Sequence, residues 1–224
     1  MGETLSRVDV DFNSPKSKAL RSIIENNRFP VISVGEVALE MRTGFASGKD
    51  DQADDAQSGV PHIRPMNITP LGEFTLEKSK FVPKNIYEPP LQKGEVLFNN
   101  TNSTAWVGKT AVFDSDVLCY CSNHITRISF DSSVEPYFVA PLFNALRGLG
   151  VFGLLSTNFN NQAGINTATL GEFRFPLPPL ETQQTIANEV RARREQAQEL
   201  RAQAQARWNT AKARFEAALL GGTT

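Results

Sequence analysis

Residues 176–220 read PLPPLETQQTIANEVRARREQAQELRAQAQARWNTAKARFEAALL, and this stretch decides the architecture of the chain. After its proline-rich start it runs for about forty residues without Pro or Gly, and strong helix formers such as Ala, Gln, Glu, Arg and Leu dominate it. Gly221 and Gly222 follow, where a helix would end. At ~1.5 Å per residue the predicted helix is about 60 Å long, which is longer than the core of a small domain requires.

An apolar seam runs along the predicted helix. Its side chains recur at steps of three and four residues, close to the mean step of about 3.5 in a coiled coil. The seam consists of Ile186, Val190, Ala197, Leu200, Ala204, Trp208, Ala211, Phe215 and Ala218, with Arg193 as the one polar interruption. Because alanine makes up much of it, a partner helix can approach closely, so we predict dimerisation through this seam. A long amphipathic helix lying on its own domain is the alternative.

The composition fits one ordinary globular domain with an appended element. The chain has 224 residues, of which 40% are hydrophobic and 21% are charged. No apolar run approaches the length of a membrane span, and the first residues carry charge where a secretory peptide needs an apolar stretch. We therefore expect a cytoplasmic protein with no membrane partner. Two cysteines, Cys119 and Cys121, fit a reducing compartment, and their spacing beside His124 indicates a core strand rather than a zinc site.

Charge is distributed unevenly along the chain. Residues 181–224 hold seven Arg or Lys against five acids, which leaves 16 of the 23 bases and 19 of the 24 acids for residues 1–180. Sequence-independent affinity for DNA comes from neutralising phosphates, so this balance weakens the case for DNA binding. Part of the acidic excess is local, because Asp50, Asp51, Asp54 and Asp55 cluster in one loop. We expect any DNA binding by this chain alone to be weak.

Three segments resemble the specificity subunits of type I restriction–modification systems. The segment 173–186, FRFPLPPLETQQTI, is similar to the family's I-P-L-P-P-L-x-E-Q-x-x-I turn before a long spacer helix, although Thr182-Gln183 stands where the family usually shows a glutamate before the glutamine. Residues 32–45, ISVGEVALEMRTGF, resemble the opening L-G-D-V-A-x-I-x-x-G, and residues 91–97 resemble L-x-x-G-D-I-L. The usual subunit contains two recognition domains and two spacer helices, whereas this sequence shows one of each.

The resemblance and the residue patterns predict an α+β fold, in which a β-rich target recognition domain precedes one long C-terminal coiled-coil helix. The predicted boundaries are 1–27 for a lead-in with a short helix at 17–26, 28–178 for the DNA-reading domain and 179–224 for the spacer and dimerisation helix. Within the DNA-reading domain, the patterns place strands at 31–34, 60–64, 110–113, 117–130 and 169–175, and a turn into a strand at 91–98. They also place helices at 35–41 and 136–147 and a hairpin turn at 114–116.

Two loops, 99–104 and 156–167, concentrate Asn, Gln, Ser and Thr. Amides can pair with adenine edges, hydroxyls can meet bases or phosphates, and Arg or Lys can contact phosphates. Composition alone favours ordinary surface turns, whereas the resemblance implies that such loops read bases from a β-rich core. The predicted DNA contacts are Arg42, Thr43, Arg64, Lys80, Asn99, Asn100, Asn102, Ser103, Thr104, Lys109, Asn158, Asn160, Asn161, Gln162 and Asn166.

The sequence lacks the usual catalytic motifs. It shows no phosphate-binding loop, no amino-methyltransferase motif and no carboxylate–lysine cluster typical of nucleases, so we predict a non-catalytic subunit. The resemblance implies that methyltransferase subunits, and in some complexes restriction subunits, dock on it and carry S-adenosylmethionine and ATP. Three hypotheses remain: an antiparallel homodimer that reads a bipartite DNA site, the recognition module of a split or fused methyltransferase–endonuclease, and a coiled-coil assembly adaptor that binds no DNA.

Overall fold

The computed structural model describes residues 14, 15, 18, 22, 28–48, 52–53, 57–84, 88–159 and 162–219. The chain divides into two compact units, Met1–Gln184 and Thr185–Thr224. Most of the short helix predicted at 17–26 lies outside the described residues, and so does the acidic cluster from Asp50 to Asp55.

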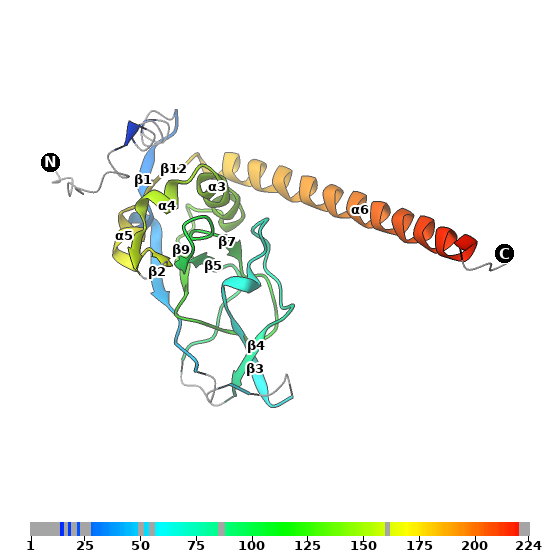
Figure 1. Cartoon of the computed structure of the whole chain (residues 1–224). Coiled ribbons are helices and arrows are strands. Elements are labelled where there is room, and N and C mark those ends of the chain that lie inside the picture. Colours follow the sequence, from blue (N-terminus) through cyan, green and yellow to red (C-terminus); the bar gives the residue numbers. More distant parts are fainter. Residues whose placement is uncertain are drawn as a thin grey trace. The chain divides into compact units, whose positions relative to one another are not determined.

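A four-stranded antiparallel sheet forms the centre of the first unit (Figure 1). Its strands, in spatial order, are β2 (Ala38–Thr43), β9 (Ile125–Phe130), β5 (Val96–Asn99) and β7 (Thr110–Val112). Helix α3 (Pro136–Gly148) packs against β5 and β7. Asn144 ties α3 to β7, because it accepts a hydrogen bond from Thr110 N (3.3 Å) and donates one to Thr110 O (2.6 Å). The β-rich core and the helix predicted at 136–147 are therefore confirmed.

Phenylalanine rings fill the space between α3 and this sheet. Phe98 on β5 lies 6.3 Å from Phe143 on α3, measured between ring centroids. Phe152 on α4 (Val151–Leu155) lies 5.0 Å from Phe98 and 5.5 Å from Phe143. Phe173 and Phe175 pack edge-on against Phe143, and all five rings are buried. Such aromatic pairs add about 0.5–1.5 kcal/mol each beyond their burial, so this cluster stabilises the unit strongly.

A second sheet contains, in spatial order, β4 (Lys80–Pro83), β3 (Gly59–Ile63) and β8 (Tyr120–Cys121). The 3-10 helix η1 (Pro65–Asn67) follows β3 in the chain. Strand β8 runs parallel to β3. The prediction of a hairpin turn at 114–116 was wrong, because this segment connects β7 to β8 in a different sheet. Both cysteines are buried, as expected of a core strand, and burial raises the pKa of each thiol to about 12.

The helix predicted at 35–41 is mostly a strand. Ser33 N donates to Glu36 Oε2 at 2.6 Å and starts α2 (Val34–Val37), but this helix has only four residues. From Ala38 onward the chain forms β2, since pairing with β9 satisfies its backbone groups. The tertiary contact therefore overrides the helix-forming residues Leu39 and Glu40.

The strand predicted at 169–175 is largely a helix. Asn166 Oδ1 accepts a hydrogen bond from Thr169 N at 2.8 Å and caps α5 (Thr167–Glu172). Only β12 (Arg174–Pro176) is extended, and it pairs antiparallel with β1 (Val31–Ser33). This pairing confirms the strand predicted at 31–34 and brings the first and last strands of the unit together.

Helix α6 (Leu180–Leu219) is continuous, which confirms the long C-terminal helix and the α+β class. Gln183 anchors its first turn within the first unit and is fully buried. Its Nε2 donates to Ser133 O (2.9 Å) and Pro178 O (2.8 Å), and its Oε1 accepts from Glu135 N (2.9 Å). Both polar atoms of this buried side-chain amide are thus paired, so Gln183 has a structural role.

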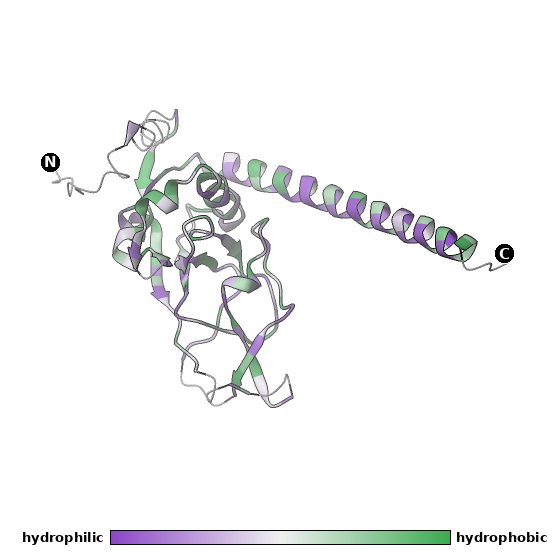
Figure 2. Ribbon diagram, in the orientation of Figure 1, coloured by the Kyte–Doolittle hydropathy of each residue, from purple (hydrophilic) through white to green (hydrophobic). Residues whose placement is uncertain are grey.

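The second unit exposes the apolar side chains of its seam. Leu200, Trp208 and Phe215 expose 58%, 66% and 64% of their surface. Figure 2 shows hydrophobic and hydrophilic residues alternating along α6. Large apolar residues exposed along one side of a helix, with alanines between them, are typical of a protein–protein contact. The coiled-coil pairing itself remains a prediction.

Candidate nucleic-acid interface

A small antiparallel sheet joins the two amide-rich loops, and we name it the polar sheet. Its strands, in spatial order, are β10 (Thr157–Phe159), β11 (Gln162–Gly164) and β6 (Thr101–Asn102). The register places Asn158 opposite Ala163 and Ala163 opposite Asn102, so two asparagines share one row. Ile165 N also donates to Asn100 O at 2.9 Å. The loop predicted at 156–167 therefore contains a hairpin, which lies directly against the loop at 99–104.

The polar sheet offers several exposed hydrogen-bonding groups. Asn158 and Gln162 are exposed, as are Ser103 and Thr104 in the turn after β6. Asn102 is half-buried, and its Oδ1 accepts a hydrogen bond from Ser103 N at 2.9 Å. Exposed amides and hydroxyls of this kind can form hydrogen bonds with base edges. The structure places these five predicted DNA contacts on the polar sheet and the turn after β6. Because Asn158 pairs with the residue next to Gln162, Asn158 and Gln162 lie on opposite faces of the sheet.

The other amides of the second loop differ from this group. Asn166 is exposed, but its side-chain oxygen is engaged in capping α5. Asn160 and Asn161 lie outside the described residues. Their predicted contacts with DNA therefore stay predictions.

Three of the predicted DNA contacts are buried side chains held by the protein, which is a correction to the prediction. Asn99 is fully buried, and its Nδ2 donates to Trp106 O at 3.0 Å. Asn100 donates to Asn123 O (3.1 Å) and Thr126 Oγ1 (3.0 Å). Lys109 Nζ donates to the carbonyl oxygens of residues 65 and 68, at 2.8 and 2.7 Å. Burial, followed by the nearby Arg147 guanidinium, lowers the pKa of Lys109. These buried side chains stabilise the neighbouring backbone and cannot contact a base or phosphate in this conformation.

The remaining predicted contacts come from other sheets. Arg42 and Thr43 end β2, where Arg42 Nε lies 3.0 Å from Glu40 Oε1. Lys80 begins β4 and is exposed, whereas Arg64 follows β3 and is half-buried. The structure therefore does not gather these cations on the polar sheet, and their phosphate contacts stay predictions.

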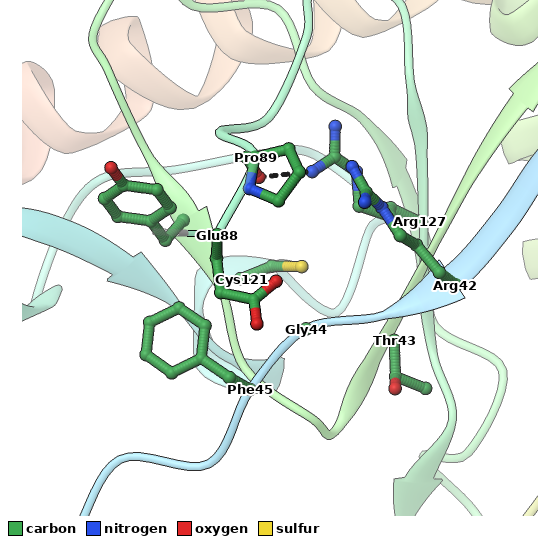
Figure 3. Close-up of a pocket in the computed structure, with 9 residues that line it drawn as sticks. Arg42, Thr43, Gly44, Phe45, Glu88, Pro89, Cys121 and Arg127 are labelled. Atoms are coloured by element: carbon green, nitrogen blue, oxygen red, sulfur yellow. Dashed lines mark hydrogen bonds between the residues drawn. The ribbon is translucent and has the colours of Figure 1, made fainter. Parts of the chain in front are cut away.

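A small hollow lies beside Arg42 and Thr43, between β2, β8 and β9 (Figure 3). Arg127 lines it from β9, and its guanidinium donates to Pro89 O at 2.7 Å. The hollow has a volume of about 10 Å³, which is room for about one water molecule. Small-molecule sites are commonly several hundred Å³, so this hollow is not a substrate or cofactor pocket.

Sequence reasoning missed the buried pair of Arg127 and Glu95. Arg127 Nη2 lies 2.7 Å from Glu95 Oε1, and both side chains are only 5% exposed. Glu95 lies in the segment 91–97 that resembles L-x-x-G-D-I-L, but no motif marks Arg127. A charged residue in an alternating strand ordinarily faces solvent, so nothing in the sequence indicated that the two pair. The structure shows instead that the pair holds the segment at 88–91 to the central sheet.

Within the described ranges, no group of three or more His, Cys, Asp or Glu could hold a metal ion. The helices in this same part of the chain include none with the length and apolarity needed to cross a membrane.

The family profile described as "Type I restriction modification DNA specificity domain" matches residues 16–192. The chain belongs to this family. Its match includes all three strands of the polar sheet and the start of α6. A specificity subunit from Methanocaldococcus jannaschii, named for the type I restriction enzyme MjaX, is 30% identical over 96 residues, which cover 42% of this chain and 23% of that protein. The family assignment supports recognition of DNA sequence as the function of this domain.

Two solved structures share the fold of this specificity domain. A structure from a study of complex assembly and conformational transition of a type I R-M system has a TM-score of 0.63 and 20% identity, over 94% of this chain and 51% of the matched one. The HsdS subunit from Thermoanaerobacter tengcongensis has a TM-score of 0.54 and 18% identity, over 83% of this chain and 44% of that subunit. This chain thus spans about half or less of the length of these relatives.

Proposed function

We propose that this chain recognises a short DNA half-site through the polar sheet, as the specificity subunit of a type I restriction–modification complex. The convergence of two amide-rich segments on one sheet, in a chain of this family, carries the proposal. Asn158 supplies an exposed amide that can form paired hydrogen bonds with adenine, and it shares its row of the sheet with Asn102. The chain itself catalyses no reaction and leaves the chemistry to partner subunits.

Substitution of Asn158 tests this reading role. If Asn158 contacts a base, Asn158→Ala relaxes the preference at one position of the selected DNA sequence, and one lost bidentate contact corresponds to about 1–3 kcal/mol of discrimination. Asn188→Ala, an exposed Asn on α6, is the matched control and leaves the selected sequence unchanged. Identical sequence preferences for the wild type and Asn158→Ala would count against this contact.

The spacing of the seam in α6 supports an antiparallel homodimer. From Val190 to Ala218 the steps are three, four, three, four, four, three, four and three residues. This series reads the same in both directions, and Ala204 lies at its centre. Two copies that run in opposite directions with Ala204 facing Ala204 therefore place every seam residue of this stretch opposite another seam residue. Such an arrangement has the two-fold symmetry of a closed dimer.

This register gives chemically sensible neighbours across the dimer. Ala197 faces Ala211, and these small residues let the backbones approach closely, as at Ala204. Leu200 faces Trp208, which buries the largest exposed side chain of the seam. Arg193 faces Phe215, and a guanidinium over an aromatic ring contributes about 0.5–1 kcal/mol at an exposed site. The polar interruption of the seam thus meets a suitable partner.

Single-cysteine cross-linking tests the register, because the two native thiols are buried and their pKa is raised to about 12. Ala204→Cys is expected to cross-link to its own copy, whereas Ala206→Cys, on the opposite face of the helix, is not. Ala197→Cys alone is also expected to fail, since its two copies are about 21 Å apart along the axis. It should cross-link when mixed with Ala211→Cys. Self-linking of Ala197→Cys would indicate a parallel pair and refute the register, and a monomer at all concentrations would refute the dimer.

The complex proposed for this dimer includes other subunits. Two identical readers at a fixed separation would read a palindromic, interrupted site. DNA methyltransferase subunits would dock on the paired helices, restriction subunits could join them, and S-adenosylmethionine and ATP would bind to these partners. Mixing the chain with a methyltransferase subunit from the same genome and mapping methylated DNA tests this assembly. Methylation that needs the chain and follows its selected motif supports the proposal, and methylation of the same sites without the chain contradicts it.

A further inference from the structure

The turn between β6 and β7 presents an aromatic side chain beside the polar sheet. Trp106 lies in this turn, four residues after Asn102, and is 39% exposed. The exposed Ser103 and Thr104 stand between the two. An exposed tryptophan is therefore continuous in the chain with the groups proposed to read DNA.

The backbone of this turn is fixed by contacts from four directions. Trp106 O accepts a hydrogen bond from the buried Asn99, and Arg147 Nη1 donates to Ala105 O at 3.1 Å. Gly108 has a positive φ of 87°, and a side chain there would meet the ring of Phe152 at 2.4 Å. Thr104 packs in the same way against Gly153 of α4, where an added Cβ would lie 2.8 Å from Thr104 Cγ2. The turn is thus preorganised, which reduces the entropy lost when a ligand binds it.

Two cations hold the Trp106 ring in place. Arg147 Cζ lies 5.2 Å from the ring centroid and Lys109 Nζ lies 5.5 Å from it. Both distances are within the range of a cation–π interaction. Lys109 is committed to two backbone carbonyls, and Arg147 Nε is buried without a hydrogen-bond partner. The ring is therefore flanked by two cations whose own positions are fixed by hydrogen bonds to backbone carbonyls.

We propose that Trp106 contacts DNA by stacking against a base at the border of the site that the polar sheet reads. This inference rests on the proposed DNA recognition and assigns it a further contact residue. Because Trp106 is only 39% exposed, it can act as a partial wedge at a base step rather than intercalate fully. Apolar wedges of this kind unstack flexible steps and kink the duplex. Stacking is independent of base identity, so Trp106 contributes affinity whereas the amides contribute specificity.

The two tryptophans of the chain allow a direct test, since one lies in each unit. In a Trp208→Phe background Trp106 is the single tryptophan, and its fluorescence is expected to be quenched by a random-sequence duplex at low salt. In the matched Trp106→Phe background only Trp208 remains, and no such quenching is expected. Quenching of Trp208 alone, or of neither tryptophan while DNA binds, would overturn the proposal.

Affinity measurements separate stacking from a purely structural role. Trp106→Leu is expected to weaken DNA binding by a roughly 5- to 150-fold increase in Kd, which is the effect of losing the stacking of one base. Trp106→Tyr should retain most of the affinity. The wild type should also prefer a duplex with one mismatched base pair, because unstacking is easier there, and Trp106→Leu should lose this preference. Circular dichroism verifies that each variant is folded.

The experiments distinguish failure of the Trp106 contact from failure of DNA recognition by the polar sheet. If Trp106→Leu binds both duplexes as the wild type does, while Asn158→Ala changes the selected sequence, Trp106 is no DNA contact and the polar sheet still reads DNA. If Trp106→Leu binds DNA normally but loses a methyltransferase subunit, the tryptophan is a protein contact and the proposal is wrong. If the wild type binds no duplex at all, both proposals are refuted.

Discussion

The buried pair of Glu95 and Arg127 allows a quantitative test of how the first unit is held together. Glu95 Oε1 accepts hydrogen bonds from Arg127 Nε (2.9 Å) and Nη2 (2.7 Å), and Glu95 Oε2 accepts one from Gln92 N (2.8 Å). Arg127 also donates to the carbonyl oxygens of Pro89 and Pro90. Glu95→Leu leaves the guanidinium buried without its counter-charge, which typically costs about 3–5 kcal/mol. For a unit of this size that corresponds to a fall in Tm of roughly 6–20 °C.

The double variant Glu95→Leu/Arg127→Met distinguishes a buried charge from simple loss of packing. Replacing a buried ion pair by apolar residues is often close to neutral, so the double variant should be more stable than Glu95→Leu alone. Thermal unfolding followed by near-ultraviolet circular dichroism compares the wild type, Glu95→Leu, the double variant and a control. Asp116→Ala removes one partner of an exposed pair with Lys93 (3.2 Å) and should leave Tm nearly unchanged. A Glu95→Leu variant that unfolds like Asp116→Ala, or a double variant no more stable than Glu95→Leu, would refute the reasoning.

The remaining predictions concern pH, thiol reactivity and salt. Burial, followed by the charge of Arg64, lowers the pKa of His62 from 6.5 to about 4. The unfolded chain therefore binds a proton that the folded chain excludes, and stability should fall as pH decreases from 6.5 to 4; His62→Leu should show a shallower fall in Tm. Cys119 and Cys121 should resist a thiol reagent at pH 8 until the protein unfolds, because their thiols stay protonated, and rapid labelling of the native protein would contradict this. Residues 181–224 carry seven bases against five acids, so two paired copies repel on balance and dimerisation should tighten with salt, whereas DNA binding weakens. Sedimentation and DNA titration over the same salt series would show whether the two trends are opposite.

The long helix was predictable because its signal is local. About forty residues without Pro or Gly and a seam at helical spacing leave few other structures for this stretch, and α6 extends from Leu180 to Leu219. The buried strands β5 and β9 were also predictable from their apolar residues. The segment at 38–43 was not, because β2 forms by pairing with a strand more than eighty residues away. Propensity within the segment carries no information about that partner.

The amino-acid composition predicted which loops are polar, but not which of their side chains are exposed. Runs of Asn, Ser and Thr indicated the two polar loops, but residue type alone could not separate outward side chains from supporting ones. Asn99 and Asn158 are the same amino acid, yet Asn99 is fully buried and Asn158 is exposed. Lys109 was expected on the surface, and it is enclosed by backbone carbonyls instead. These differences arise from long-range packing of the segments at 65–68 and 99–109.

The central claim is that the polar sheet reads a half-site and that paired α6 helices hold two such readers at a fixed separation. Selection of DNA from a random duplex pool by the full chain tests this claim most directly. Sequencing of the bound fraction is expected to reveal one short motif that occurs twice, in inverted orientation, with a constant gap. Asn158→Ala should lose preference at the same position of both copies. A bound fraction with the base composition of the starting pool would contradict the account.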